Sequence, residues 1–485
     1  MADRGSGRFT TGSTMRHVAV MTAAGSAGLF FLFLVDFATL FFVSLLGDET
    51  LTAGVGFAWA IQFVTASVGI GLSIAAMALV SRSIGARKRE KARSEATSAI
   101  VITVCVLTVT AISVIALRRP LCAIIGAEGE AAEVAARFLL ISVSSLPFVG
   151  MSMVSASILR AEGDARRSML VTMTGGAVAL ALAPLLMFTL GMGVDGAALA
   201  MVVSRAASSL TGVRFCMGRA LLAPPSLRGA RLMARPFFAI AGPAVATQLS
   251  TPLANLLFTW WVSDFGDSAV AGWAVASRLT VLSFGGIFAL SGAIGGIIGQ
   301  NYGARLGERV ARTYRDALIF ATCYVVSAWA LLATLAPVLV RGFGVSDAGA
   351  SVILAFCYVG AGGFMFNGAL FVANAAFNNL GRPLWSTAFN WTRDAVVTPL
   401  ALVSVPTTLG APGVVYAQAV AGVLVGAAAV VAGWRLSRSI GFTIAPEKTD
   451  WPVAPPPTGS ARAAMAMMDA RRGDAAPLAK PDALD

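Results

Sequence analysis

Charge and catalytic side chains are scarce in this chain. Of its 485 residues, 12% are charged and 57% are hydrophobic, and the mean hydropathy is +0.78, whereas soluble domains carry about 25% charged residues. The sequence has a single histidine, His17, no phosphate-binding loop and no zinc-ligand spacing. ATP hydrolysis and metal-assisted hydrolysis therefore lack the side chains they need. We predict a membrane protein that is not an enzyme, has no cofactor and relies on an ion gradient for work across the membrane.

The cysteines show no metal-ligand spacing either, and all five lie in or beside apolar runs. They are Cys105, Cys122, Cys216, Cys323 and Cys357. We interpret them as small packing residues. The first apolar run is too long for the core of a signal peptide and has no convincing cleavage site after it, so we expect it to remain a helix.

Apolar runs long enough to cross a membrane recur along the chain, separated by short clusters of Gly, Pro or Arg. A helix needs about 20 such residues to span about 30 Å of hydrocarbon. The pattern predicts an all-α polytopic protein with twelve transmembrane helices. They are expected at residues 17–46, 50–80, 97–117, 136–158, 168–190, 196–218, 236–263, 268–298, 316–340, 350–376, 385–408 and 413–435.

The net charge of +12 is concentrated in alternate loops. The loops after the second, fourth, sixth, eighth and tenth spans carry most of the Arg and Lys residues. This asymmetry follows the positive-inside rule. It predicts a multi-pass protein of the inner (plasma) membrane with both termini in the cytoplasm, and it argues against nucleic acid as a partner.

Four glycine landmarks recur at a nearly constant offset and indicate an internal duplication. The pairs are Gly47 and Gly266, Gly85 and Gly303, Gly163 and Gly381, and Gly196 and Gly413, with offsets of 219, 218, 218 and 217. Each copy holds six predicted spans, so both copies enter the membrane in the same orientation. We therefore predict two six-helix bundles, 17–220 and 236–437, related by a pseudo-twofold axis near the membrane normal, an arrangement that commonly places a substrate site between the halves. The linker 221–235 is expected in the cytoplasm, and residues 1–16 and 438–485 are expected to be disordered.

Asp36 is the main candidate for function because it lies alone in the apolar stretch VDFATLFFVSLLGD from Val35 to Asp48. A charge at the centre of the bilayer costs about 2.5 to 3.5 kcal/mol on insertion scales, so such a group is usually functional. The alternative is a structural aspartate that is protonated or bonded to the backbone. The repeat places Asn255 at the equivalent position, so only the N-terminal half can titrate there.

Other polar residues fall inside the predicted spans. Arg205 lies at a depth similar to that of Asp36 and is a candidate ion-coupling partner. Arg278 and Asp394 are candidates for a structural ion pair in the second half, because charges inside a membrane usually pair. The candidates for the substrate cavity are the amides Gln62, Gln248, Asn255, Asn367 and Asn374. Hydrogen bonding between helices is the alternative for each of these amides.

Several motifs, taken in their order and spacing, resemble those of the multidrug and toxic compound extrusion (MATE) transporters of the bacterial type. They are VD followed by LLGD, VSRSIGARKREKA, LRAEGD, GVDGAALA, FALSGAIGGIIGQNYGA and FNNLGRP. The likeness covers residues 17–435. It implies twelve helices in two bundles, a central cavity that opens outward, and export of amphipathic, often cationic compounds against inward H⁺ or Na⁺.

The resemblance places Asp36 on the carboxylate that these transporters use for ion coupling, but nearby positions depart from the pattern. Relatives have an Asn and an Asp four residues apart before a proline, and here Ala179 and Ala183 precede Pro184. A Thr expected in the sixth helix is Met201. Sodium needs several oxygen ligands, whereas a proton needs only the carboxylate, so the sequence favours H⁺ and keeps Na⁺ as the alternative.

We therefore predict a monomeric antiporter that exports amphipathic or cationic organic molecules in exchange for inward protons, through Asp36 and without a metal. Two alternatives remain. A flippase for a lipid-linked substrate would need basic patches within the cavity, whereas the basic residues lie mostly in loops. A membrane scaffold without transport is the alternative from a different class.

Overall fold

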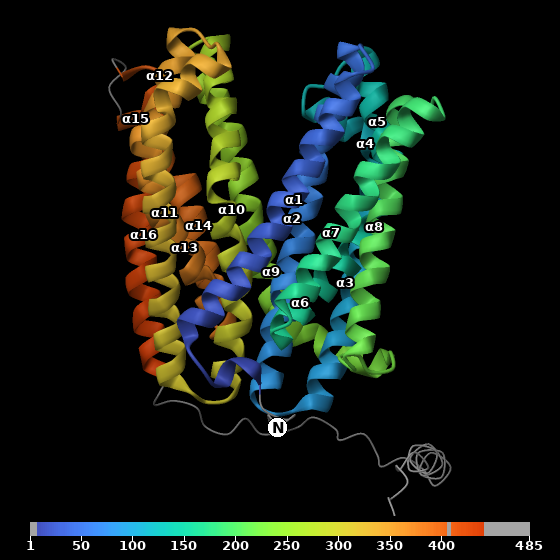
Figure 1. Ribbon diagram of the computed structural model, residues 1–485, viewed down its shortest axis with the longest axis vertical. Coiled ribbons are helices and arrows are strands. Elements are labelled where there is room, and N and C mark those ends of the chain that lie inside the picture. Colours follow the sequence, from blue (N-terminus) through green and yellow to red (C-terminus); the bar gives the residue numbers. More distant parts are fainter. Residues whose placement is uncertain (1–6, 405–408, 441–485) are drawn as a thin grey trace, which may run out of the picture. The chain divides into compact units, whose positions relative to one another are not determined.

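The computed structural model describes residues 7–404 and 409–440, apart from the side chains of Leu40 and Glu49. Every regular element in these residues is helical, which confirms the all-α class (Figure 1). The predicted disordered tail falls, from residue 441 on, outside the described residues. The helices are α1 (Thr14–Ser44), α2 (Glu49–Gly85), α3 (Arg89–Ala116), α4 (Arg118–Ile124), α5 (Gly129–Val143), α6 (Leu146–Glu162), α7 (Ala165–Pro184), α8 (Gly193–Gly218), α9 (Leu227–Ser263), α10 (Asp267–Gly303), α11 (Gly307–Phe343), α12 (Asp347–Ala355), α13 (Ala361–Asn379), α14 (Pro383–Trp391), α15 (Thr398–Ser404) and α16 (Pro412–Ser439).

Shorter turns complete several spans. A 3-10 turn, η1 (Arg8–Thr10), precedes α1, and three π-helical turns interrupt longer helices. These are η2 (Leu185–Thr189), η3 (Phe356–Gly360) and η4 (Thr392–Val397). Helix α9 begins at Leu227, inside the segment predicted as a linker. Residues 7–13, assigned to a disordered terminus from the sequence, are an ordered segment in which Phe9 is buried.

Ten helical stretches of the described chain are long and apolar enough to cross a membrane, and α5 with α6, bent by 50°, forms an eleventh. The remaining predicted span, 385–408, the eleventh in chain order, corresponds to α14, η4 and α15, from Pro383 to Ser404, and its residues 405–408 lie outside the described residues. This stretch contains Arg393 and Asp394 at its centre, which lowers its mean hydropathy below that of the others.

The landmarks of the duplication adopt matching backbone conformations in the two copies. Three pairs of equivalent residues have positive φ angles, a conformation that L-residues rarely adopt. Two of these pairs are glycines and one is a pair of arginines. The pairs are Gly47 (74°) and Gly266 (91°), Arg87 (60°) and Arg305 (59°), and Gly163 (89°) and Gly381 (85°). The repeat read from the sequence is therefore also a repeat of local structure.

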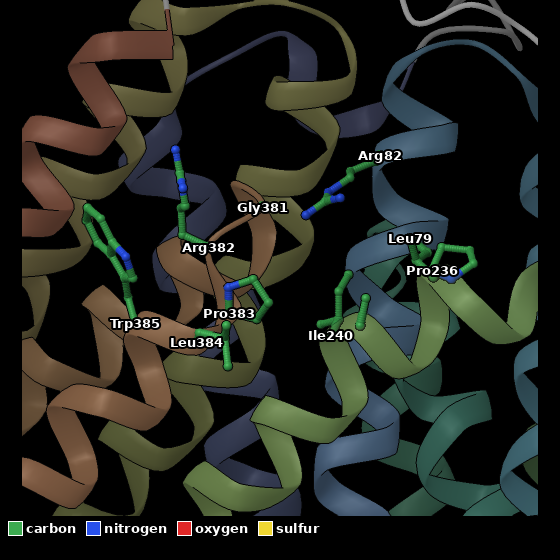
Figure 2. Close-up of a pocket in the computed structure, with 10 residues that line it drawn as sticks. Leu79, Arg82, Pro236, Ile240, Gly381, Arg382, Pro383, Leu384 and Trp385 are labelled. Atoms are coloured by element: carbon green, nitrogen blue, oxygen red, sulfur yellow. The ribbon is translucent and has the colours of Figure 1, made fainter.

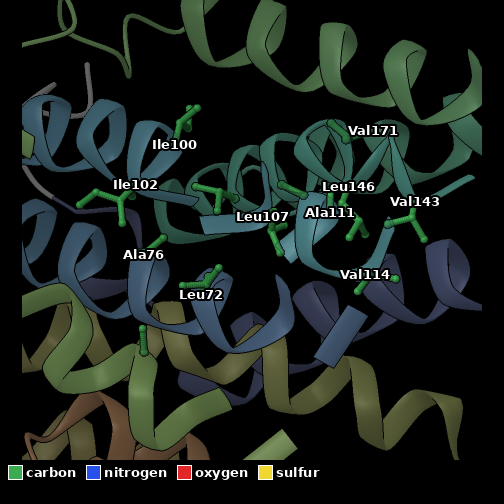
Figure 3. Packing of buried hydrophobic residues seen from close by; sticks show 14 of the residues in the cluster. Leu72, Ala76, Ile100, Ile102, Leu107, Ala111, Val114, Val143, Leu146 and Val171 are labelled. Carbon is green, nitrogen blue, oxygen red and sulfur yellow. The ribbon is translucent and has the colours of Figure 1, made fainter. Parts of the chain in front are cut away.

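Two hydrophobic cores form, one for each half, and each includes the start of the other half's first helix. The N-terminal core, drawn in part in Figure 3, contains Met233 and Phe237 from the beginning of α9. The C-terminal core contains Val18 and Met21 from the beginning of α1. In Figure 1, α1 starts beside α11 and ends among the N-terminal helices. Helices α1 and α9 therefore cross from one half to the other.

The loops after α2, α6, α8, α10 and α13 lie together at one end of the molecule, which we call the basic end. Hydrogen bonds between segments that are distant in the sequence show that these loops lie close to one another. Arg219 at the end of α8 donates to Asp164 before α7 (2.8 Å), and Arg93 in α3 donates to the Leu222 carbonyl before α9 (2.9 Å). Alternate loops thus share one face, as the charge pattern predicts.

Candidate ion and substrate site

Asp36 is held by the packing of α1 against α7. A Cβ atom on Gly176 would lie 2.9 Å from Val35, and one on Gly28 would lie 3.8 Å from Thr172, so small residues let the two helices approach closely. The Asp36 side chain is partly buried. Within residues 7–404 and 409–440, no hydrogen bond or ion pair reaches its carboxylate. Asp36 is therefore an acid within a membrane-spanning helix that has no bonded partner among the described residues.

Two guanidinium groups act on Asp36 electrostatically, Arg205 from α8 and Arg278 from α10. The Arg278 side chain is exposed and makes no hydrogen bond to the described part of the chain. The site thus combines one acid from the N-terminal half with one base from each half. With Asp36 ionised these three groups have a net charge of +1, and with Asp36 protonated the net charge is +2.

Arg205 is bonded to the protein rather than paired with Asp36. Its guanidinium donates to Gln62 Oε1 (2.7 Å), Ser145 Oγ (2.8 Å) and the Ser142 carbonyl (3.0 Å). These acceptors lie in α2, at the end of α5 and just after it, so Arg205 joins three helices of the N-terminal half. It stays close enough to Asp36 for their charges to interact. The direct ion pair considered from the sequence is absent from the described residues.

The predicted pair of Arg278 with Asp394 does not form. Asp394 is paired with its neighbour Arg393, through Nε to Oδ1 (2.6 Å) and Nη2 to Oδ2 (2.8 Å). Both residues lie in the π turn η4. Sequence reasoning missed Arg393 because it looked for the partner of Asp394 on another helix; a charged dipeptide at the centre of a span was the available signal.

The five amide candidates divide into two groups. Gln62, Asn367 and Asn374 make contacts between helices: Asn367 accepts a hydrogen bond from Arg393 (3.1 Å) and Asn374 accepts one from Asn390 (3.0 Å). In contrast, the side chains of Gln248 and Asn255, in α9, make no hydrogen bond to the described residues, and that of Asn255 is exposed. Gln248 and Asn255 are therefore the two amides whose side chains make no hydrogen bond at all to the described residues, while Gln62 has a bonded oxygen and an unbonded Nε2.

Side-chain oxygens for a metal cation are few around Asp36. The α1–α7 register puts Ala179 one turn beyond Gly176, at the depth of Asp36, and both Ala179 and Ala183 are buried. Across the described residues there is no group of three or more His, Cys, Asp or Glu side chains placed to hold a metal ion. Ala179 and Ala183 thus contribute no side-chain oxygen at these two positions.

A pocket of about 430 Å³ lies elsewhere, at the basic end between α2, α9 and the α13–α14 loop. Figure 2 shows Leu79, Pro236 and Ile240 on one side and Arg382 and Trp385 on the other. The Arg382 guanidinium lies 5.9 Å from the centre of the Trp385 ring. Gln62, which bonds Arg205 near Asp36, and Leu79, which lines the pocket, both lie in α2. At 1.5 Å per residue they are about 25 Å apart along the helix, so the pocket is distant from Asp36.

Comparison with known proteins agrees with this architecture. Two segments, residues 26–185 and 243–403, each match the MatE family. They begin 217 residues apart and end 218 apart, so the family match reproduces the repeat. A transporter of the MOP superfamily from Pyrococcus furiosus superimposes with a TM-score of 0.84 at 23% identity, over 91% of this chain and all of the other. The Vibrio cholerae MATE transporter VcmN superimposes with a TM-score of 0.82, also at 23% identity, over 88% of this chain and 98% of the other.

Curated relatives are similar in sequence as well. An FAD transporter of Shewanella oneidensis is 24% identical over 417 residues, which cover 84% of this chain and 92% of the relative. The multidrug export protein MepA of Staphylococcus aureus is 21% identical over 272 residues, which cover 56% of this chain and 60% of MepA. The fold is thus the twelve-helix, two-bundle fold predicted from the sequence, and the chain belongs to the MatE family of multi-span membrane transporters.

Proposed function

We propose that this transporter exports amphipathic organic compounds, cations among them, in exchange for protons that bind Asp36. The observation that carries the proposal is the carboxylate itself, which is embedded among apolar helices and has no bonded partner in the described chain. A buried acid without a fixed partner changes charge when its environment changes. Asp394, which is locked to Arg393, is not suited to that task.

The proposed cycle has two steps. Protons from outside neutralise Asp36, which removes the charge that holds a cationic compound, and the compound leaves outward. Loss of the proton toward the cytoplasm then restores the carboxylate, while the two halves exchange which end is open. We place both termini and the basic end in the cytoplasm because the Arg and Lys residues gather there. The scarcity of oxygen ligands around Asp36 favours H⁺ over Na⁺ as the coupling ion.

Proteoliposomes test this proposal directly. A fluorescent organic cation is offered under an imposed pH gradient and, separately, under an imposed Na⁺ gradient, with wild type beside Asp36→Asn. We expect movement of the dye driven by the pH gradient alone, and none above protein-free liposomes for the variant. Undiminished pH-driven movement by Asp36→Asn would reject Asp36 as the coupling group, and movement driven only by Na⁺ would reject the proton.

A second cargo class, organic anions, is favoured by the two arginines at the site. Arg205 and Arg278 exceed the single charge of Asp36, and guanidinium groups bind carboxylates and phosphates well. One relative is an FAD transporter, and FAD carries a pyrophosphate. The two cargo classes differ in the sign of their coupling, because a cation competes with the proton for Asp36 whereas an anion binds together with it.

The direction of movement decides between these classes. Under the same inward pH gradient a cation moves outward against the protons, and an anion moves inward with them. Matched dyes of opposite charge in the same liposomes therefore give opposite directions if both are carried. Transport of the anion alone would replace the cation in the proposal while keeping Asp36 as the coupling residue.

A further inference from the structure

The first seven residues that the structure describes form a bridge at the basic end. We call residues Gly7–Ser13, which lead into α1, the N-terminal strap. Its Phe9 ring is buried in the C-terminal core, with 1% of its surface exposed, and stands edge-on to the His17 ring at 5.2 Å. A segment of this composition, RFTTGS, has no reason to be ordered by itself. Its order comes from what it contacts.

Most of those contacts are to the C-terminal half. The Phe9 amide donates to Gln300 Oε1 (2.8 Å), and directly after the strap the hydroxyl of Thr14, the first residue of α1, donates to Asp316 Oδ2 (2.5 Å). Arg309 in α11 binds three carbonyl groups of the strap. These are the carbonyls of Phe9 (2.9 Å), Gly12 (3.0 Å) and Thr11 (3.1 Å). Arg309 thus donates hydrogen bonds to backbone carbonyl groups of the strap that have no acceptor role within a helix.

A smaller set of contacts reaches the N-terminal half at the end of α6. Arg8 donates to the Gly163 carbonyl (3.0 Å). A Cβ atom on Gly163 would lie 2.9 Å from Arg8 Cδ and 3.1 Å from Phe9 Cζ, so the strap packs directly on this glycine. The strap therefore has several hydrogen bonds to the C-terminal half and one, from Arg8 to Gly163, to the N-terminal half, and its Gly7 also lies close to Ile84 in α2.

Beneath the strap, α2 and α10 meet backbone to backbone. A Cβ atom on Gly85 would overlap the Gln300 carbonyl, and one on Gly303 would overlap the Arg82 carbonyl. The repeat offset of 218 relates Gly85 to Gly303 and Arg82 to Gln300. The pseudo-twofold axis therefore passes through this contact, which we call the α2–α10 crossing.

The same symmetry relates two hydrogen bonds that join the halves. Gln300 Nε2 donates to the Ala161 carbonyl at the end of α6 (2.6 Å). Arg82 Nε donates to the Asn379 carbonyl at the end of α13 (3.1 Å). Ala161 and Asn379 are again 218 residues apart. Each half thus bonds the last carbonyl groups of a helix in the other half, α6 or α13. The strap lies beside the Gln300 bond. The pocket of Figure 2 lies beside the Arg82 bond.

We propose that the α2–α10 crossing and the N-terminal strap form the gate that closes the basic end, and that the strap stays with the C-terminal half when this gate opens. Opening then breaks the bonds from Arg8 to Gly163 and from Gln300 to Ala161, while the Arg309 bonds persist. Gln300, Arg82 and Arg309 become positioning residues for transport. The proposal rests on the proposed function only in requiring that the halves separate at this end.

Spin-label distances test the direction of strap movement. Three label pairs use exposed positions in a background without the five native cysteines: Arg166 with Arg312 between the halves, Thr11 with Arg166 from strap to N-terminal half, and Thr11 with Arg312 from strap to C-terminal half. When a change of pH shifts the population, we expect the first two distances to lengthen together and the third to stay unchanged. Lengthening of Thr11–Arg312 would overturn the strap assignment and leave the proposed function intact.

Two arginine variants give a matched comparison. Arg8→Ala removes the bond to Gly163, and the loss of one charge-assisted hydrogen bond corresponds to about a tenfold change in an equilibrium. We expect the ratio of molecules with a long to those with a short Arg166–Arg312 distance to rise about tenfold. Arg16→Ala removes the same charge from an exposed side chain that makes no bond to the described residues, and should leave that population unchanged. Equal responses of the two variants, or an Arg166–Arg312 distance that never lengthens while the liposomes transport, would overturn the gate.

Discussion

Two aspartates lie deep in the membrane region, one in each half, and their surroundings are opposite. Asp36 in the N-terminal half has no bonded partner in the described chain and is partly exposed. Asp394 in the C-terminal half is bound at both oxygens by Arg393, with 8% of its side chain exposed. The two copies thus differ in that the acid of the C-terminal half has a bonded partner and the acid of the N-terminal half has none in the described chain. On our proposal, this difference assigns a structural role to Asp394 and proton coupling to Asp36.

The arginines of the two halves differ in the same way. Arg393 neutralises an acid, whereas Arg205 is held by the uncharged groups of Gln62, Ser142 and Ser145 and keeps its full positive charge. The N-terminal half therefore has an arginine and an acid that share an electric field without sharing a bond. Such an arrangement lets the acid gain and lose a proton while the helices remain packed.

Replacing Asp36 should give the largest effect of any single substitution on transport. We expect Asp36→Asn to reduce pH-driven movement of cargo to the rate of protein-free liposomes, because the amide cannot take up the proton. The midpoint of thermal unfolding in detergent should stay within a few degrees of wild type, since no bond is lost. A variant that instead fails to fold would show that Asp36 is structural and would remove the contrast with Asp394.

Replacing Asp394 should act on stability instead. Asp394→Asn leaves Arg393 buried without a counter-charge, and breaking one side of a buried pair costs about 3 to 5 kcal/mol. We expect a large fall in the unfolding midpoint. The double variant Arg393→Met with Asp394→Leu should recover most of that loss, because it removes both charges. Loss of pH coupling in a well-folded Asp394 variant would contradict the structural role assigned here.

Gln62 tests how Arg205 is held. Gln62→Leu removes the shortest of the three hydrogen bonds of Arg205, and a bond to a charged group is worth about 1.5 to 3 kcal/mol. The unfolding midpoint should fall, by less than for Asp394→Asn. The Gln62→Asn variant keeps the amide group but is too short to reach Arg205, so it controls for the loss of side-chain polarity. An unchanged midpoint for both variants would mean that the two serine acceptors suffice.

Arg278 should give the smallest change in stability and still alter selectivity. Its side chain is exposed and unbonded within the described residues, so Arg278→Ala should shift the unfolding free energy by less than about 0.5 kcal/mol. Removing this positive charge should favour cationic over anionic dyes in competition assays. Arg312→Ala, an exposed arginine at the basic end, is the control for net charge and should leave that preference unaltered.

The fold was largely predictable because it follows from hydropathy and from one repeated spacing. Twelve apolar runs and the offset near 218 fix the number, order and direction of the helices without any knowledge of side-chain contacts. The partners of buried charges were not predictable in this way. Asp394 pairs with its chain neighbour Arg393 rather than with Arg278 on another helix, and hydropathy and composition do not distinguish these two partners.

The N-terminal strap escaped prediction for a related reason. Its sequence is short, polar and rich in glycine, which usually indicates disorder, and its order depends on Gln300 and Arg309, about 290 residues away. The available signal was the repeat: transferring Arg82 by 218 positions reaches Gln300, a buried amide at a helix end with hydrogen bonds to fill. Asking what that amide contacts would have led to the segment before α1.

The close fit of Gly7 has a practical consequence for handling the protein. A β-carbon at this position would lie 2.6 Å from Gln300 Oε1, so any larger residue here would displace the Gln300 side chain. A purification tag or fluorescent reporter joined close to this entry would press on the contact that Gln300 makes with Phe9 and bias any measurement of gating. Such fusions belong at the opposite end of the chain, after α16.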